Sequence, residues 1–276
     1  MNQNKVCVIT GGSSGMGFAA AKRMGKKGYT LVLAARTPAK LETAIAQLAQ
    51  DGIDAYACRC DISDWNSVQE LARFAQAKGK VEIVLHIAGM SPHMGDAEKI
   101  MRGNALGTIH IHDAFYPILT EGACLVDTSS MSAYMAPAFV MPKRAFPLAG
   151  TDREAFMKKM MARVNMIPKK NRPGMAYAVS KYFVIQYVKQ EAARFGAKGV
   201  RVLAITPGNF ETPMGELEKE EAQTYLKFNA IKRLGQPDEI AALYEAVSDP
   251  AMGYLTGTDI ICDGGCIASG AGAFSR

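Results

Sequence analysis

The stretch VCVITGGSSGMG, residues 6–17, leads from an apolar run into a turn with four glycines. Val6–Thr10 has the composition of a buried β-strand. Gly11, Gly15 and Gly17 would allow a tight turn, a close approach of the backbone to a ligand and close packing of the next helix on the strand. The free N–H groups at the start of that helix suit a pyrophosphate. The stretch therefore predicts a dinucleotide-binding turn, although glycine-rich turns also serve purely structural roles.

The rest of the chain repeats this alternation of strand and helix. Ala39–Gln50 and Ser67–Ala77, for example, carry apolar residues at helical spacing. Near-continuous apolar strands separated by helices indicate a parallel sheet covered by helices on both faces. The strands expected from these runs are Val6–Thr10, Thr30–Ala35, Ala55–Cys60, Val81–Ala88, Ala123–Thr128, Val200–Thr206 and Asp259–Cys262.

Length and composition are those of a well-packed globular protein. The chain has 276 residues, 49% of them hydrophobic and 21% charged. This length allows one large α/β domain or two small ones, and of these we expect one domain over residues 1–276. The formal net charge of +6 is modest and basic residues gather only in Lys158–Arg172, so no nucleic-acid partner is expected. Without a leader-like N-terminus or an apolar run of membrane-spanning length, we expect a cytoplasmic protein with no membrane partner.

The histidines do not suggest a metal centre. His86, His93, His110 and His112 have no carboxylate or cysteine partners at the spacing that zinc sites use. We therefore expect no bound metal.

A second chemical signal lies in GMAYAVSKYF, residues 174–183. Tyr177 and Lys181 are four residues apart and so lie on one face of a helix. Most such pairs are a packed phenol and a solvated ammonium. An ammonium about 4 Å from the phenol oxygen, however, favours the phenolate by about 4 kcal/mol in a protein environment. That interaction would lower the pKa of the tyrosine toward neutrality, where a general acid–base works best.

The glycine turn and the tyrosine–lysine pair belong to a set of motifs that runs nearly the whole length of the chain. Thr10–Gly17 has the form T-G-x-x-x-G-x-G, and Tyr177–Lys181 has the form Y-x-x-x-K. With these motifs the sequence resembles the short-chain dehydrogenase/reductase family. The resemblance implies a Rossmann-type, doubly wound parallel sheet of seven strands in the order 3-2-1-4-5-6-7, with helices on both faces. The other matching motifs are CDISD at 60–64, HIAG at 86–89, GNALGT at 103–108, DTSS at 127–130, TPGNFETP at 206–213 and TGTDIICDGG at 256–265.

The resemblance also implies a catalytic role for four residues. Tyr177 would be the general acid–base of hydride transfer between an alcohol or ketone and a nicotinamide, and Ser130 would orient the substrate oxygen. Lys181 would hold the nicotinamide ribose, and Asn104 would anchor a water that supplies protons. Two departures from the family pattern matter here: Met131–Ser132–Ala133 replaces the common x-x-G after the serine, and Ile87 stands where the family usually has asparagine. The fourth strand must therefore be tied to the cofactor loop in another way.

The same resemblance implies a set of cofactor contacts. The second expected strand ends at Ala35, where NAD-specific relatives usually carry an acidic residue, and Arg36 and Thr37 follow. A guanidinium and a hydroxyl suit a 2′-phosphate, so we expect a preference for NADP(H) over NAD(H). The residues expected to contact the cofactor are Gly11, Ser13, Ser14, Gly15, Met16, Gly17, Arg36, Thr37, Asp61, Ile62, Ala88, Gly89, Lys181, Pro207, Gly208 and Thr212.

Residues 134–173 form an insertion far longer than a usual loop between strand and helix. Within it, Thr151 and Glu154 have the spacing of a capping box, and a helix with an apolar stripe follows. We expect a mobile helical lid over the active site and a bulky hydrophobic alcohol or ketone, such as a steroid or bile acid, as substrate. A similar insertion occurs in some bacterial hydroxysteroid dehydrogenases of the family. The alternative is that the stripe, which consists of Phe156, Met157, Met160, Met161 and Val164, packs against a neighbouring subunit.

Other functions stay open on the sequence alone. The substrate could be a smaller cyclic or acyl ketone, and a nucleotide-occupied sensor without turnover is a different class of function. Ser130, Tyr177 and Lys181 argue against the sensor, because it would not need an acidified phenol. Family members commonly assemble through paired helices, and the apolar residues between Phe183 and Val188 could serve such a contact. We therefore expect a homotetramer or a homodimer.

Overall fold

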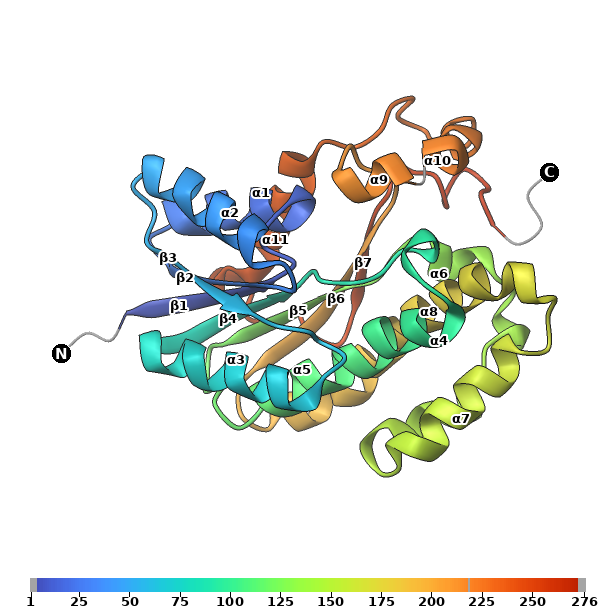
Figure 1. The fold of residues 1–276 in the computed structure, drawn as a ribbon, viewed down its shortest axis with the longest axis horizontal. Helices are drawn as coiled ribbons and strands as arrows, with labels where there is room; N and C mark the ends of the chain where they lie inside the picture. The colour runs from blue at the N-terminus through green and yellow to red at the C-terminus, as the bar shows by residue number, and fades with distance from the viewer. Residues whose placement is uncertain (1–3, 218, 273–276) are drawn as a thin grey trace.

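A computed structural model describes residues 4–217 and 219–272 of the chain. Its centre is a sheet of seven parallel strands in the order β3-β2-β1-β4-β5-β6-β7 (Figure 1). The expected sheet and strand order are confirmed, and the strand ends differ from expectation by at most two residues. The strands are β1 (Lys5–Thr10), β2 (Thr30–Ala35), β3 (Ala55–Arg59), β4 (Lys80–His86), β5 (Cys124–Thr128), β6 (Arg201–Pro207) and β7 (Asp259–Cys262).

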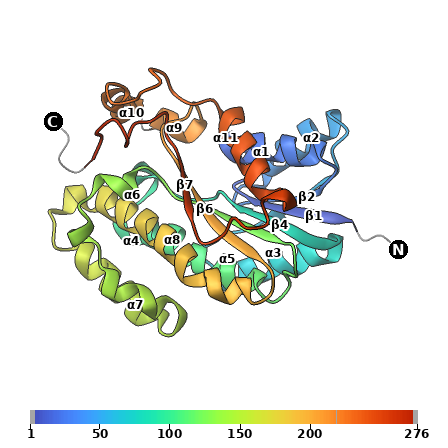
Figure 2. The ribbon, with the colours of Figure 1, turned by 180° about the vertical axis from the view of Figure 1, so that it is seen from behind.

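Helices cover both faces of the sheet (Figure 2). Because successive side chains of a strand point to opposite faces, Ile9 enters one core and Val8 enters the other, and both are fully buried. The helices on the Ile9 face are α1 (Gly15–Lys26), α2 (Pro38–Gln50) and α11 (Pro237–Ser248), and those on the Val8 face are α3 (Trp65–Lys78), α5 (Gly107–Phe115) and α8 (Arg172–Gly196).

The strand order reverses next to β1, and this reversal positions the site. The chain leaves β1 toward β2 and β3 and then returns to β4 on the other side of β1. Thr10, at the end of β1, pairs with Ala34 of β2 and with His86 of β4. The helices that follow β1 and β4 cover opposite faces, so a crevice opens at the carboxyl ends of these strands, where α/β folds bind ligands.

A buried charged cluster lies between β5, α5 and α8. Asp127 and His112 are both fully buried, and Nε2 of His112 lies 2.6 Å from Oδ2 of Asp127. Glu191 of α8 lies 3.7 Å from Nδ1 of the same imidazole. Burial opposes a charge on the ring, but the two carboxylates outweigh it and raise the pKa of His112 to about 9. The imidazole is therefore protonated at neutral pH.

The helix of the insertion is α7 (Arg153–Val164), and it begins one residue later than the capping box predicts. Asp152 is the N-cap, and its Oδ1 accepts a hydrogen bond from Ala155 N at 2.9 Å. The prediction that Thr151 caps the helix was wrong. Thr151 instead completes the preceding 3₁₀ segment, where its N–H donates to the carbonyl oxygen of Leu148.

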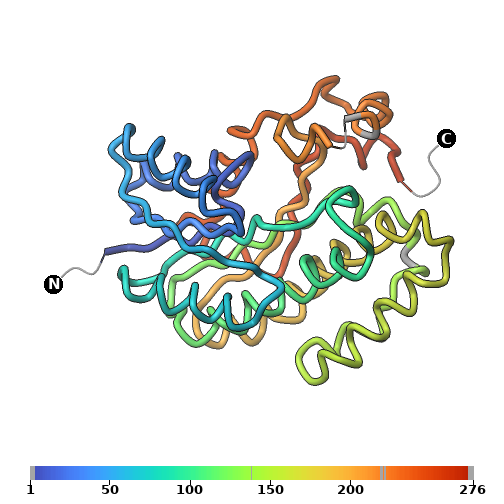
Figure 3. The backbone as a smooth tube through the Cα atoms, in the orientation of Figure 1, coloured from blue at the N-terminus to red at the C-terminus, as the bar shows by residue number. Residues whose placement is uncertain are grey.

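The apolar stripe of α7 faces the body of the protein. Phe156, Met160 and Val164 are fully buried in one core with residues of α4 (Ala97–Met101) and α8, and the two other methionines of the stripe are half-buried beside them. Figure 3 traces the insertion as a detour that runs from the end of β5 out to α7 and back to α8. The stripe is therefore covered within the chain itself, and α7 lines neither of the two pockets described below.

The apolar face of α8 is covered within the chain as well. Phe183, Val184, Tyr187 and Val188 are each at most 3% exposed. Phe183 stacks on Tyr187 with the ring centroids 5.1 Å apart. Core packing accounts for these side chains, so they no longer support a contact between subunits.

In the part of the chain that the structure describes, no helix combines the length and the apolar character needed to cross a membrane. Nor do the described residues include a group of three or more histidine, cysteine or carboxylate side chains placed to hold a metal ion.

Candidate active site

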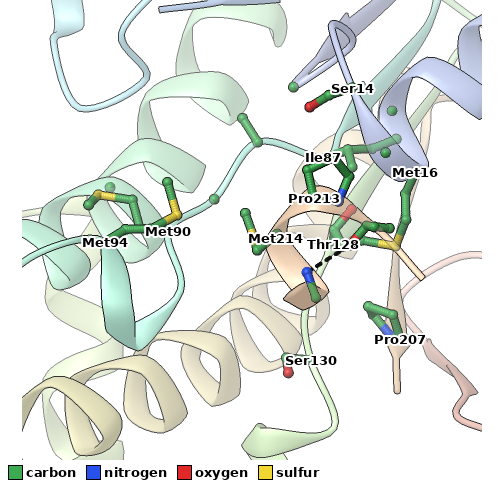
Figure 4. Close-up of a pocket in the computed structure, with 18 of the residues that line it drawn as sticks. Ser14, Met16, Ile87, Met90, Met94, Thr128, Ser130, Pro207, Pro213 and Met214 are labelled. Carbon is green, nitrogen blue, oxygen red and sulfur yellow. Dashed lines mark hydrogen bonds between the residues drawn. The ribbon is translucent and has the colours of Figure 1, made fainter. Parts of the chain in front are cut away.

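A pocket of about 550 Å³ follows the carboxyl ends of the strands (Figure 4). It brings together all the residues that the sequence predicts for the cofactor, although they come from well separated parts of the chain. They are Gly11, Ser13, Ser14, Gly15, Met16 and Gly17 after β1, Arg36 and Thr37 after β2, Asp61 and Ile62 after β3, Ala88 and Gly89 after β4, Lys181 of α8, and Pro207, Gly208 and Thr212 at or after the end of β6.

The wall of the pocket at the glycine turn consists mainly of backbone atoms. Gly11 has a φ of 71°, which residues other than glycine rarely adopt. A β-carbon on Gly17 would lie 2.3 Å from the carbonyl oxygen of Gly11, closer than packed atoms allow. Helix α1 begins at Gly15 with no acidic residue in its first turn, so its N–H groups present a positive end to the pocket. The turn therefore suits a phosphate group.

Thr10 holds the loop after β4 against the glycine turn. Its Oγ1 accepts a hydrogen bond from Ala88 N at 3.1 Å and lies 2.8 Å from Nδ1 of His86. Burial lowers the pKa of His86 to about 4, so this ring is neutral at physiological pH. Ile87 adds only its backbone N–H, which donates to the carbonyl oxygen of Thr10. These bonds hold the fourth strand to the glycine turn without the asparagine side chain that the family usually has at position 87.

Basic side chains line the end of the pocket beside β2. Arg36 and Thr37 are exposed there, and Ser13 and Ser14 line the same pocket. Lys40, in the first turn of α2, lines it too and was not predicted. The sequence does contain a signal for Lys40. A lysine in the first turn of a helix is unfavourable unless an anion lies nearby, so its position indicates an anion-binding site.

Asp61 borders the pocket at the end of β3. Its Oδ1 accepts hydrogen bonds from Ser63 N at 2.9 Å and from Ser63 Oγ at 2.7 Å. Partial burial acts to raise the pKa of Asp61, but these bonds and the positive charges of Arg36 and Lys99 outweigh it and lower the pKa. The carboxylate is therefore an ionised acceptor with a fixed orientation.

Ser130, Tyr177 and Lys181 all line the pocket near the end of β5, where Figure 4 shows Thr128 and Ser130. Lys181 is 5% exposed, and its Nζ donates to the carbonyl oxygen of Thr128 at 2.8 Å. Ser129 Oγ in turn donates to the carbonyl oxygen of Lys181 at 2.8 Å. These two bonds lock α8 to the end of β5, directly before the serine.

A second pocket of about 310 Å³ adjoins the first. Ser130, Met131, Tyr177 and Asn209 line both pockets, so the two spaces meet at these residues. None of the residues that line the second pocket is charged. Its other lining residues are Pro92, Ser132, Met135, Ala136, Gly174, Met175, Ala178 and Tyr225.

Asn104 stands behind the wall of the first pocket and does not line it. It lies in the π-helical turn Arg102–Leu106. Its Oδ1 accepts from Met90 N at 2.8 Å, and its Nδ2 donates to the carbonyl oxygen of Met90 at 3.0 Å and to Ser180 Oγ at 3.2 Å. The side chain therefore ties the loop after β4 to α8, and its contact with a proton-supplying water stays a prediction.

The roof over the crevice was not predicted from the sequence. Figure 1 shows α9 (Pro213–Leu217) and α10 (Lys219–Leu226) above the ends of the strands. Met214 and Glu216 line the first pocket, and Tyr225 lines the second. The motif that ends at residue 213 marks where this segment begins, but the residues after it show no pattern that points to a site.

Three kinds of comparison relate the chain to known proteins. Residues 5–142 match the family model described as short chain dehydrogenase, and residues 138–266 match the model described as Enoyl-(Acyl carrier protein) reductase. The short-chain dehydrogenase/reductase bsc3 of Alternaria brassicicola is 30% identical over 273 residues, which cover 97% of each chain. A 7alpha-hydroxysteroid dehydrogenase of Bacteroides fragilis is 23% identical over 95% of this chain and 94% of its own, and a meso-2,3-butanediol dehydrogenase of Serratia marcescens is 26% identical over 96% of both.

The fold also matches solved structures. A short chain dehydrogenase from Burkholderia cenocepacia J2315, solved in complex with NADP, has a TM-score of 0.75 at 25% identity, and the match covers 96% of this chain and 98% of that chain.

Proposed function

The chain is an oxidoreductase of the short chain dehydrogenase family, and on that premise we propose that it interconverts a secondary alcohol and a ketone with NADP(H). The observation that carries this proposal is the meeting of two pockets at Ser130 and Tyr177. The first pocket is lined by the glycine turn, Arg36 and Lys181, which suit a dinucleotide. The second pocket is lined by uncharged residues and suits a substrate. A bound nicotinamide would accept or supply the hydride, so the chain itself supplies binding, orientation and a proton.

We assign the proton to Tyr177, which lines both pockets. The buried ammonium of Lys181 lies 5.9 Å from the centre of the tyrosine ring. It favours the phenolate over the phenol, because opposite charges attract. Tyr177 thereby gives a proton to a ketone oxygen in reduction and takes one from an alcohol in oxidation. Ser130 Oγ holds the same oxygen by a hydrogen bond.

The preference for NADP(H) over NAD(H) is part of this proposal. Arg36, Thr37 and Lys40 line the pocket where β2 ends, and β2 ends without a carboxylate. Two cations and a hydroxyl favour a ribose that carries a phosphate, and a guanidinium matches phosphate geometry closely. The solved relative in complex with NADP supports the same choice.

Arg36→Ala is expected to raise the KM for NADPH about tenfold or more, because a hydrogen bond to a charged group contributes about 1.5–3 kcal/mol. The KM for NADH should change little, since that cofactor has no 2′-phosphate. Steady-state kinetics with both cofactors measure the difference. Arg73→Ala removes another exposed arginine, on α3 and outside the pocket, and should change neither KM. Equal increases for both cofactors in Arg36→Ala would contradict the assignment.

We also propose a bulky hydrophobic substrate, such as a steroid or a bile acid. Met131, Met135 and Met175 line the second pocket, and methionine side chains adapt well to large apolar ligands. The relative named as a hydroxysteroid dehydrogenase agrees with this size class, whereas the relative named as a butanediol dehydrogenase favours the alternative, a smaller ketone. A sensor without turnover is the remaining alternative, and nothing about it requires a lysine buried beside a pocket tyrosine.

An assay with NADPH and a panel of oxosteroids, oxo bile acids and small cyclic and linear ketones decides among these substrates. We expect kcat/KM to be highest for the large ketones. Met135→Ala and Met175→Ala widen the second pocket and should change the ranking of the ketones by kcat/KM. Met157→Ala should leave the ranking unchanged, because Met157 lies on α7, outside both pockets. Highest activity on the small ketones would refute the size class. No turnover with any ketone or alcohol would refute the enzymatic function and favour the sensor.

A homotetramer, a cytoplasmic location and a lid formed by residues 134–173 stay predictions. Light scattering at micromolar concentration distinguishes a tetramer from the 29.7 kDa monomer. A lid would involve the start of the insertion most directly, because Met135 and Ala136 line the second pocket and α7 does not.

A further inference from the structure

The wall of the second pocket is tied to the far edge of the sheet by one side-chain contact. Tyr134 OH donates to Oδ2 of Asp259 at 2.6 Å, and Thr206 Oγ1 donates to Oδ1 of the same carboxylate at 2.7 Å. Tyr134 lies four positions after Ser130, whereas Asp259 begins β7, 125 residues later than Tyr134. The contact therefore links the segment that follows the serine to the last strand.

This segment needs anchors because it has little regular structure of its own. It forms α6 (Ser132–Met135), a single helical turn that is too short to be stable in isolation. Before α6, Met131 N donates to the carbonyl oxygen of Pro207 at 2.9 Å, which fastens the backbone to β6. Within α6, Tyr134, the first residue of the insertion, adds a second tie to the sheet.

The position of α6 determines two features of the site. Ser132 and Met135, on either side of Tyr134, line the second pocket. Ser132 N also donates to Ser130 Oγ at 3.2 Å, so α6 directs the hydroxyl that is proposed to hold the substrate oxygen. A shift of α6 would change both features and leave the glycine turn and Arg36 in place.

We propose that Tyr134 is a positioning residue, whose hydrogen bond to Asp259 holds α6 and thereby sets the shape of the substrate pocket and the direction of Ser130 Oγ. A phenol that donates to a carboxylate makes a charge-assisted bond, which is stronger than a bond between neutral groups. The kinetic consequence rests on the proposed function, whereas the anchoring of α6 is a property of the fold alone.

The anchoring can be tested without any activity. Tyr134→Phe removes the donor and keeps the ring, and the backbone amides of residues 130–136 are expected to exchange with solvent deuterium about tenfold faster. The amides of β6 (Arg201–Pro207) should be unaffected. Tyr254→Phe is the matched control, because Tyr254 is fully exposed. Unchanged exchange in residues 130–136 would overturn the proposal.

The positioning role is tested by kinetics on the same variants. In Tyr134→Phe we expect kcat/KM for the ketone to fall about tenfold while the Kd for NADPH stays as in the Tyr254→Phe control. Asp259→Ala, which removes the acceptor of Tyr134 and also that of Thr206, should cause at least as large a loss, and Tyr134→Phe should add little to it, because the phenol then has no bond to Asp259 to lose. Additive losses, or an equal loss of NADPH affinity, would overturn the role. If the wild-type protein turns over no ketone but the exchange result holds, the proposed function fails and the anchor stands.

Discussion

Tyr177→Phe is expected to lower kcat by about three orders of magnitude, because a general acid–base contributes about 10²–10⁴-fold to a rate. The substitution removes only the hydroxyl that exchanges a proton with the substrate oxygen. The aromatic ring stays at the junction of the two pockets, and the bond from Lys181 Nζ to the carbonyl oxygen of Thr128 does not involve it. Stopped-flow measurement of NADPH oxidation at saturating ketone gives the rate directly.

Two measurements show whether that loss is chemical. The Kd for NADPH and the melting temperature of Tyr177→Phe should match those of the wild type, since the cofactor pocket and the core are unchanged. Tyr182→Phe is the matched control, because this tyrosine lies on the same helix and lines neither pocket. If Tyr177→Phe keeps more than about a tenth of the wild-type kcat, another group carries the proton.

Asp127→Asn is expected to lower the free energy of unfolding by about 3–5 kcal/mol, the usual cost of removing one partner from a buried ion pair. The carboxamide keeps the shape of the side chain, so the loss reports charge and not packing. It leaves a protonated His112 buried, with Glu191 3.7 Å from its Nδ1 as the nearby counter-charge. Urea denaturation at pH 7 measures the change. Adding His112→Asn should recover part of the loss, because the double variant no longer buries the imidazolium, and a smaller stability in the double variant would contradict the explanation.

The same cluster gives the stability of the protein a pH dependence of definite sign. The pKa of His112 is raised from 6.5 to about 9 on folding. Its contribution is therefore fully present below about pH 6.5 and is lost as the pH rises through 9. That loss amounts to about 3 kcal/mol. It should be visible as a lower urea midpoint for the wild type at pH 10 than at pH 6, whereas Asp127→Asn should show a much weaker slope. Equal slopes in the two proteins would mean that the imidazole is not charged in the fold.

Glu191 makes the stability of the protein depend on pH in the acid range as well. Burial opposes its charge, but the nearby positive charges of His112 and Arg194 outweigh burial and lower its pKa. Its contribution is therefore present above its unfolded pKa of 4.5 and is lost as the pH falls through the folded value. The wild type should be most stable between these two limits.

The sheet and most of the pocket could be predicted because they depend on local features of the chain. Strands that are buried on both faces appear as continuous apolar runs, of which Val6–Thr10 is one. Gly17 must be glycine because the backbone of the turn leaves no room for a β-carbon. Tyr177 and Lys181 could be paired because one helical turn sets their separation without any tertiary information.

The remaining features depend on contacts between distant segments, which a local pattern does not show. The stripe of α7 was recognised as apolar, but its place against α4 and α8 follows from tertiary packing. The helix start moved from Thr151 to Asp152 because Thr151 is used by the preceding turn. Tyr134 and Asp259 lie 125 residues apart, and neither stands in a pattern that marks it as a partner.

The position of β1 inside the sheet has a consequence for the synthesis of the protein. Val6 pairs with Thr30 on one side and with Val81 on the other, so one edge of β1 stays unpaired until β4 has been made. A ribosome that adds about 5–20 residues per second needs about 3–10 s to pass from the end of β2 to the end of β4. During that interval the nascent chain presents an open apolar strand edge, which can pair with other chains. Pairing of this edge with other chains therefore stays a risk until residues 80–86 have left the ribosome, and a chaperone would protect the edge during this stage.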